Sequence, residues 1–112
     1  MIVSLAKIEL RNIRDWETFH DEFQRVFGFP EFYGRNMNAW IDCMSSLSCP
    51  KDGMTSIHCD MGKTITLELG DVGVFKKEYP DIYSAIIECS SFVNWRLIEA
   101  GEQPVLSLSF HG

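Results

Sequence analysis

Segments typical of β-strands alternate along this chain with segments typical of helices, and this order limits the folds open to it. Runs rich in Ile, Val and Leu predict strands at residues 2–10, 64–70 and 104–110. Apolar side chains at helical spacing predict helices at 16–27, 37–47, 71–78 and 80–100. Strands separated by helices pair in parallel through right-handed crossovers. We therefore expect a single α/β domain over residues 1–112, with a small parallel sheet of about three strands packed by helices.

The predicted strands carry polar side chains at alternate positions, which parallel strands buried on both faces usually lack. Thr66 and Glu68 alternate with apolar residues in the second strand, and Ser107 and Ser109 do so in the third. The pattern predicts either a sheet with one face partly open to water or a sheet with some antiparallel pairing.

Capping residues predict where the helices begin and end. Asp15 and Asn36 stand at N-cap positions, and Gly28, followed by Pro30, ends the first helix. In the first helix, the residues expected to face the core are Trp16, Phe19, Phe23, Val26 and Phe27, and those expected to face water are Glu17, His20, Asp21 and Gln24. In the last helix, the buried seam of Ile82, Ile86, Cys89, Val93 and Leu97 is expected to be widened by Ile87, Phe92, Trp95 and Ile98.

Composition excludes several classes of protein. Of 112 residues, 46% are hydrophobic and 12% aromatic, so the chain can fill a core and is not intrinsically disordered. Sixteen acidic and ten basic residues give a net charge of -6, and the only adjacent basic pair is Lys76-Lys77. Because nucleic-acid binding needs clustered Lys and Arg, no direct nucleic-acid partner is expected. An acidic balance suits a basic protein partner or simply keeps the chain soluble.

The start of the chain and its cysteines bear on its location. Residues 1–10 have no basic stretch ahead of an apolar one and do not predict a signal peptide. No uncharged apolar run nears the roughly 18 residues that suggest a membrane span. Cys43, Cys49, Cys59 and Cys89 form no Cys-x-x-Cys pair and are expected to be reduced thiols. We expect a monomer in the cytoplasm, with no membrane partner.

Chemical sites receive little support from the sequence. Cys43, Cys49, His58 and Cys59 are donors that zinc accepts, but their spacing fits no usual ligand pattern. Neighbours in an extended segment point to opposite faces, so His58 is badly placed to activate the thiol of Cys59. The glycine-containing segment 70–73 lacks the pattern of a phosphate-binding loop. We therefore expect no metal, no cofactor and no catalytic residue.

The segment 29–44 combines aromatic and polar side chains in an unusual way. Phe32 and Tyr33 lie in its loop, and the helix that follows carries Asn38 and Asp42 on one edge, four residues apart. Taken singly, each aromatic residue is more often part of a core, and Asp42 is more often a solvated helix residue. Together, aromatic anchors beside an acidic group suit a protein interface.

This segment also carries a resemblance to a known family. Its sequence, FPEFYGRNMNAWIDCM, closely resembles the signature of the barstar family of intracellular ribonuclease inhibitors, in which a Pro-Glu-aromatic-Tyr-Gly-x-Asn loop opens a helix ending in Asp-Cys. The upstream LRNIRDW is similar to the start of that family's first long helix. The resemblance implies a three-layer α/β fold and a reversible inhibitor that blocks the active site of a basic ribonuclease.

The same resemblance implies which residues bind the partner. Asp42 stands where the family places an acid that occupies the site of an RNA phosphate, and Phe32 stands where the family has a tyrosine that stacks on the enzyme. The implied binding set is Phe32, Tyr33, Gly34, Arg35, Asn36, Asn38, Ile41, Asp42 and Glu99. Three positions depart from the family: Asn38 replaces a second acid, Ile41 replaces an interface tryptophan, and Arg96 falls near an acid of the last helix.

Three functional hypotheses remain. The first is an inhibitor or immunity protein directed against a ribonuclease-type enzyme or toxin. The second is a non-inhibitory module in which the same loop and helix bind a non-nuclease partner. The third is a small enzyme or metal protein that uses Cys59 and His58. We favour the first hypothesis because the loop and helix carry the most specific pattern in the chain.

Overall fold

The computed structural model describes residues 1–112 and contains three strands, four α-helices and two short 3-10 helices. The strands are β1 (Leu5–Ile8), β2 (Ile65–Leu69) and β3 (Leu106–Phe110). The α-helices are α1 (Trp16–Phe27), α2 (Met37–Ser45), α3 (Val72–Glu78) and α4 (Pro80–Glu99). The 3-10 helices are η1 (Leu10–Asn12) and η2 (Pro50–Asp52). None of the helices has both the length and the apolar character needed to cross a membrane.

The three strands form one parallel sheet in the order β1-β2-β3, which confirms the predicted sheet. Ala6, Leu67 and Leu108 are register partners on the face that helices cover. On the opposite face, Thr66 and Ser107 are partners, and their hydroxyl oxygens are 2.7 Å apart in a hydrogen bond. Since all pairing is parallel, the polar alternation reflects a sheet with one face open to water.

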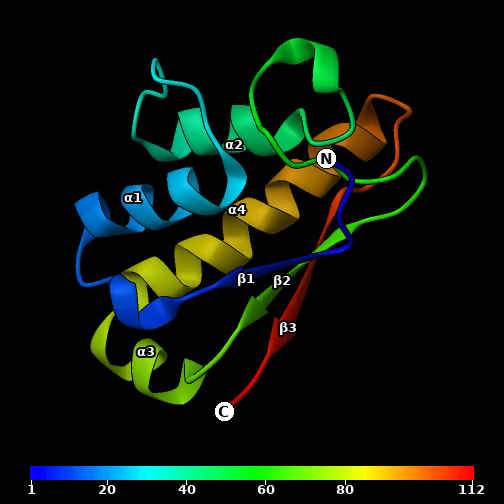
Figure 1. Ribbon diagram of the computed structural model, residues 1–112. Coiled ribbons are helices and arrows are strands. Elements are labelled where there is room, and N and C mark those ends of the chain that lie inside the picture. The colour runs from blue at the N-terminus through cyan, green and yellow to red at the C-terminus, as the bar shows by residue number, and fades with distance from the viewer.

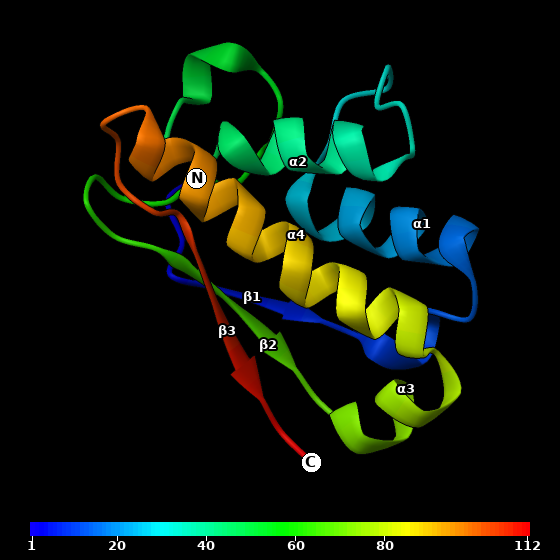
Figure 2. The ribbon, with the colours of Figure 1, turned by 180° about the vertical axis from the view of Figure 1, so that it is seen from behind.

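Helices cover the other face of the sheet in two layers. Figures 1 and 2 show α1 and α4 against the sheet, α2 beyond them, and α3 at the end of the sheet where β2 finishes. The contacts agree, since α1 packs on β1, α4 packs on β3, and α2 packs on α4. The sheet and two helical layers make the three-layer α/β fold that the resemblance implies. The bulkiest fully buried side chains are Trp40, Phe19, Phe23 and Phe27.

The helix ends form where the capping residues predict. The Asp15 carboxylate accepts a hydrogen bond from the Thr18 N–H at 2.8 Å, and the Thr18 hydroxyl accepts one from the Asp15 N–H at 3.0 Å. Gly28 ends α1 in the left-handed conformation, with φ 66°. Asn36 begins α2, and its side-chain oxygen accepts from the Ala39 N–H at 2.8 Å. The loop between α1 and α2 is therefore fixed at both ends.

The first strand is shorter than the predicted 2–10. The residues before it pair with a distant segment instead, because the His58 N–H donates to the Met1 carbonyl at 2.8 Å and the Val3 N–H donates to the His58 carbonyl at 2.9 Å. These bonds form one isolated parallel bridge between Ile2 and His58. After β1 the chain tightens at once into η1. The length of β1 is therefore set by how many of its residues can pair with β2, and not by strand propensity.

Several side chains lie on the opposite side from the one predicted. His20, expected to face water, is buried, and Trp16, expected in the core, is 41% exposed. Phe92, Trp95 and Ile98 of α4 do not widen the buried seam and are exposed. The sheet and α2 both pack on this 20-residue helix, and neither covers the side that carries these three residues.

Candidate protein-binding site

The loop before α2 contains a turn that directs one aromatic ring outward. The Tyr33 N–H donates to the Pro30 carbonyl at 2.9 Å and closes a four-residue turn. Phe32, the third residue of that turn, is 75% exposed, more than any other Phe or Trp in the chain. This ring is therefore not part of the hydrophobic core.

Tyr33 faces the other way and anchors the loop to α1. Its buried ring packs on Phe29 with 4.7 Å between the ring centroids, and its hydroxyl oxygen is 2.5 Å from Nδ1 of His20. Burial raises the pKa of Tyr33 well above its usual value, and burial lowers the pKa of His20, with the Arg35 charge adding to that effect. At neutral pH a neutral hydroxyl and a neutral imidazole therefore share this hydrogen bond.

Arg35 fastens the same loop to α1 from outside. Its backbone adopts a left-handed φ of 53°, which costs about 1–2 kcal/mol for a residue with a side chain. Its guanidinium donates to the Asp21 carboxylate at 2.8 Å, to the Glu17 carbonyl at 2.9 Å and to the Gln24 amide oxygen at 3.2 Å. These bonds offset the strain, and they occupy three of the five N–H groups of the guanidinium.

The helix α2 presents one polar edge to solvent. Trp40 and Cys43 are buried on its inner side. Asn38 and Asp42 are exposed on the outer edge, and Ile41 is half-buried beside them. The four-residue spacing thus places Asn38 and Asp42 on one edge, as the sequence predicts.

Asp42 pairs with an arginine of α4. Nη1 of Arg96 donates to Oδ1 of Asp42 at 3.1 Å, and the two side chains are 45% and 58% exposed. Ion pairs this exposed contribute about 0–1 kcal/mol, so the pair opens at little cost. Glu99 is exposed one helical turn beyond Arg96. The carboxylate of Asp42 therefore remains accessible, with a cation beside it.

The nine residues of the predicted binding set fall into two groups. Phe32, Asn38, Ile41 and Asp42 form an outward surface on the loop and α2, which we call the loop–helix surface, and Glu99 is exposed on α4. The remaining four residues shape the loop. Tyr33 and Arg35 bind it to α1. Asn36 caps α2, and its side-chain amide also donates to the carbonyl of Gly34 at 3.3 Å.

Sequence reasoning misses the roles of two residues that shape this site. His20 lies four residues after Trp16 and three before Phe23, so helical spacing alone would have placed it on the buried stripe despite its polarity. Arg96 is 54 residues from Asp42 in the chain, and no local pattern predicts their contact.

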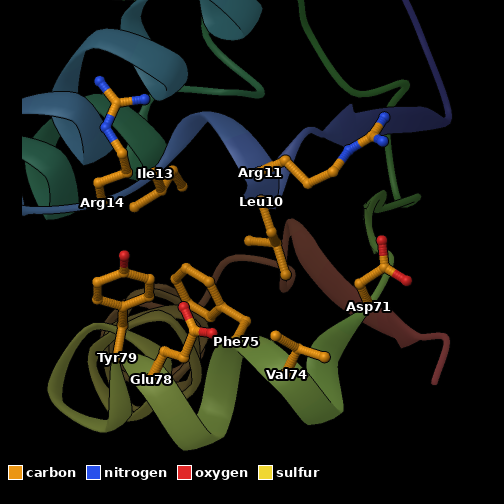
Figure 3. A pocket seen from close by; sticks show the side chains of 9 residues that line it. All are labelled: Leu10, Arg11, Ile13, Arg14, Asp71, Val74, Phe75, Glu78 and Tyr79. Carbon is orange, nitrogen blue, oxygen red and sulfur yellow. The ribbon is translucent and has the colours of Figure 1, made fainter.

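The hollows of the molecule lie away from the loop–helix surface. One, of about 230 Å³, opens between η1 and α3, where Leu10 points toward Val74 and Phe75 (Figure 3). Another, of about 440 Å³, is lined by parts of the segments 48–63 and 102–105 and by Ile2. Small molecules bind in concave pockets, so a surface that lines neither hollow suits a macromolecular partner.

The two buried cysteines are poorly suited to act as nucleophiles. Cys43 and Cys59 are buried; burial raises the pKa of Cys43 to about 11, helped by the charge of Asp42, and burial also raises the pKa of Cys59. A protonated thiol is a poor nucleophile. The fold brings together no group of three or more His, Cys, Asp or Glu side chains suited to a metal ion. The hypothesis of an enzyme or metal protein using Cys59 and His58 thus gains no support.

Comparison with known proteins places the chain in a family. No curated protein matches it. Residues 3–108 match the family model described as Barstar (barnase inhibitor), and the match includes β1, the loop, α2 and most of β3. Because the match extends over nearly the whole chain and the fold is the one expected, this protein belongs to the barstar family.

Proposed function

We propose that this protein inhibits a basic ribonuclease by placing the loop–helix surface in the enzyme's active site. Membership in a family described as barnase inhibitors supports ribonuclease inhibition in general. The observation that carries the finer proposal is the placement of Asp42. Its carboxylate is 58% exposed on the outer edge of α2, and the most exposed aromatic ring, Phe32, stands on the loop that precedes that helix.

The mechanism is binding, and no catalytic step is assigned to this chain. Ribonucleases hold the phosphates of RNA with Arg, Lys and His side chains. The Asp42 carboxylate presents two oxygens that accept charge-assisted hydrogen bonds from such groups, as a phosphate does. RNA is then excluded because the outer edge of α2 occupies the cleft.

The loop is arranged before the partner arrives. The Tyr33–His20 hydrogen bond and the three bonds of Arg35 hold the turn that carries Phe32. Ordering a loop during association costs free energy, and a loop that is already ordered avoids that cost. The net charge of -6 also attracts a basic enzyme and accelerates encounter.

Two features favour a second candidate, a non-inhibitory module with a non-nuclease partner. Arg96 forms an ion pair with Asp42, and Asn38 stands where the barstar family has an acidic residue. Both reduce the negative charge that a cluster of catalytic cations would attract. The experiment that follows separates the two candidates.

The test is inhibition of barnase, measured as RNA hydrolysis titrated with the wild-type protein, Asp42→Ala and Asp81→Ala. We expect one-to-one inhibition that is competitive with the RNA substrate. We expect Asp42→Ala to weaken the complex by roughly 2–5 kcal/mol. This is the general range for truncating one partner of a buried interfacial charge pair, and the barnase–barstar complex is one of the cases that define it. Asp81 is an exposed carboxylate in the first turn of α4 with no ion pair, so its variant keeps wild-type affinity.

Two results would contradict the proposal. One is a loss below about 0.5 kcal/mol for Asp42→Ala, which is the size of an ordinary surface substitution. The other is full activity of barnase and of other secreted basic ribonucleases at saturating protein. That second result, together with a non-nuclease protein bound through Asp42, would favour the alternative module.

A further inference from the structure

Two aromatic rings of α4 face water beside the loop–helix surface. Phe92 is 43% exposed and Trp95 is 56% exposed, and their ring centroids are 5.6 Å apart. The inner side of the same helix already supplies the core through Ile86 and Val93, which are buried. Single exposed apolar residues are ordinary, but adjacent ones mark binding surfaces, and tryptophan is among the residues that dominate interface energies.

These rings are continuous with the carboxylate of the proposed site. Phe92 and Arg96 are four residues apart and therefore neighbours on the surface of α4. Arg96 in turn pairs with Asp42 at 3.1 Å, and α2 packs directly on α4. Asp42, Arg96 and the two rings thus belong to one face that spans both helices.

Acidic side chains border the rings and indicate what kind of partner covers them. Glu88 stands four residues before Phe92, and Glu99 stands four residues after Trp95, so each lies beside a ring; both are exposed. A second copy of this chain would bring a further net charge of -6 to the contact. A basic protein is complementary to this border, whereas a second copy is repelled.

We infer that Phe92 and Trp95 form the aromatic half of the ribonuclease-binding surface and pack on an apolar area of the enzyme bordered by Lys or Arg side chains. The inference rests on the proposed function and extends it. Asp42 enters the catalytic cleft, and the rings contact the enzyme surface beside that cleft. The contact gives affinity that does not depend on mimicry of a phosphate.

Leu5 supplies a control of similar exposure on another side of the molecule. It is 51% exposed, close to the value for Trp95, and it is the register partner of Thr66 on the face of the sheet that the helices leave open. The experiment measures the Kd for barnase of Phe92→Ala, Trp95→Ala, Leu5→Ala and Asp42→Ala, with circular dichroism to verify folding. We expect at least a tenfold weakening for each ring variant and less than a twofold change for Leu5→Ala. Trp95→Phe, which keeps a ring, should retain most of the affinity.

Several outcomes would overturn the inference, and they are distinguishable from failure of the proposed function. Ring variants within twofold of wild type, with Asp42→Ala weakened, leave the proposed function intact and exclude the aromatic contact. Equal losses of affinity in Leu5→Ala and Trp95→Ala indicate a non-specific apolar effect. A wild-type dimer in sedimentation velocity that Trp95→Ala dissociates shows that a second copy covers this face. Absence of wild-type binding to barnase and to other secreted basic ribonucleases removes both proposals.

Discussion

Nη1 of Arg96 lies 3.1 Å from Oδ1 of Asp42, and this ion pair joins α4 to the outer edge of α2. The pair places a cation beside the exposed carboxylate that the proposed function requires. A basic partner must therefore displace Arg96 or share the carboxylate with it. The strength of the complex then depends on a residue that the partner need not touch.

Replacing Arg96 should strengthen the complex. Arg96→Ala removes the competing cation, so we expect the association rate with barnase to rise several-fold at low salt. The difference should shrink as salt is added, because charges are screened over roughly 10 Å at 0.1 M ionic strength. The melting temperature should change little, since the exposed pair contributes about 0–1 kcal/mol. Stopped-flow association at two salt concentrations measures this, and slower association would show that Arg96 itself contacts the enzyme.

Stability should fall as the solution becomes mildly acidic, because His20 is held neutral in the folded protein. Burial lowers the pKa of His20 below its usual value of about 6.5. As pH falls through that value, the unfolded chain takes up a proton before the folded one does, so unfolding is favoured. The melting temperature should therefore decrease below pH 6.5, and His20→Gln, which keeps a neutral partner for Tyr33, should remove most of that dependence. An unchanged pH profile in His20→Gln would contradict this assignment.

Glu22 should be among the most sensitive polar positions. Its buried carboxylate accepts hydrogen bonds from the Glu9 N–H at 2.9 Å and from the Asn12 amide at 3.1 Å, and it pairs with Arg25 at 2.7 Å. Burial opposes the charged form, but the bonds from Arg25, Glu9 and Asn12 outweigh burial and hold the pKa of Glu22 below its usual value.

Glu22→Ala leaves those donors without an acceptor, and we expect a loss of about 2–3 kcal/mol in the free energy of unfolding. The exposed Glu88→Ala serves as the control and should stay within about 0.5 kcal/mol. Urea unfolding measures both variants. The wild-type advantage should also be lost as pH falls below about 4.3 toward the lowered pKa, because the unfolded chain is protonated first. Equal losses in the two variants would show that the carboxylate does not hold η1 to α1.

Gly28 should tolerate no side chain, for two separable reasons. Its φ is +66°, and an added Cβ would lie 1.9 Å from Oγ and 2.7 Å from Cβ of Ser56. The hydroxyl of Ser56 can rotate away, but its Cβ cannot. Gly62 shares the positive φ, at +74°, with nothing within 4 Å. Gly62→Ala should cost about 1–2 kcal/mol from backbone strain, and Gly28→Ala about 1–3 kcal/mol more from overpacking. If urea unfolding gives similar losses of unfolding free energy for Gly28→Ala and Gly62→Ala, the segment around Ser56 moves aside to accept the added Cβ.

The sequence by itself determined those features that depend on neighbours within about four residues. Asp15, Gly28 and Asn36 end or begin helices as predicted, because a cap is a hydrogen bond or backbone conformation local to one turn. The order of strands and helices likewise predicted the parallel sheet, since the connections leave little choice of pairing. The edge of α2 that carries Asp42 follows from four-residue spacing in the same way.

Only the tertiary structure decided the contacts that convert this edge into a candidate site. The Tyr33 hydroxyl finds its hydrogen-bond partner, His20, on α1, and Arg96 contacts Asp42 from 54 residues away. The exposure of Phe92 and Trp95 depends on which sides of α4 the sheet and α2 cover, and their hydrophobicity does not predict it. Burial and pairing of this kind depend on which elements lie opposite one another after folding, and spacing along a single segment carries no information about that.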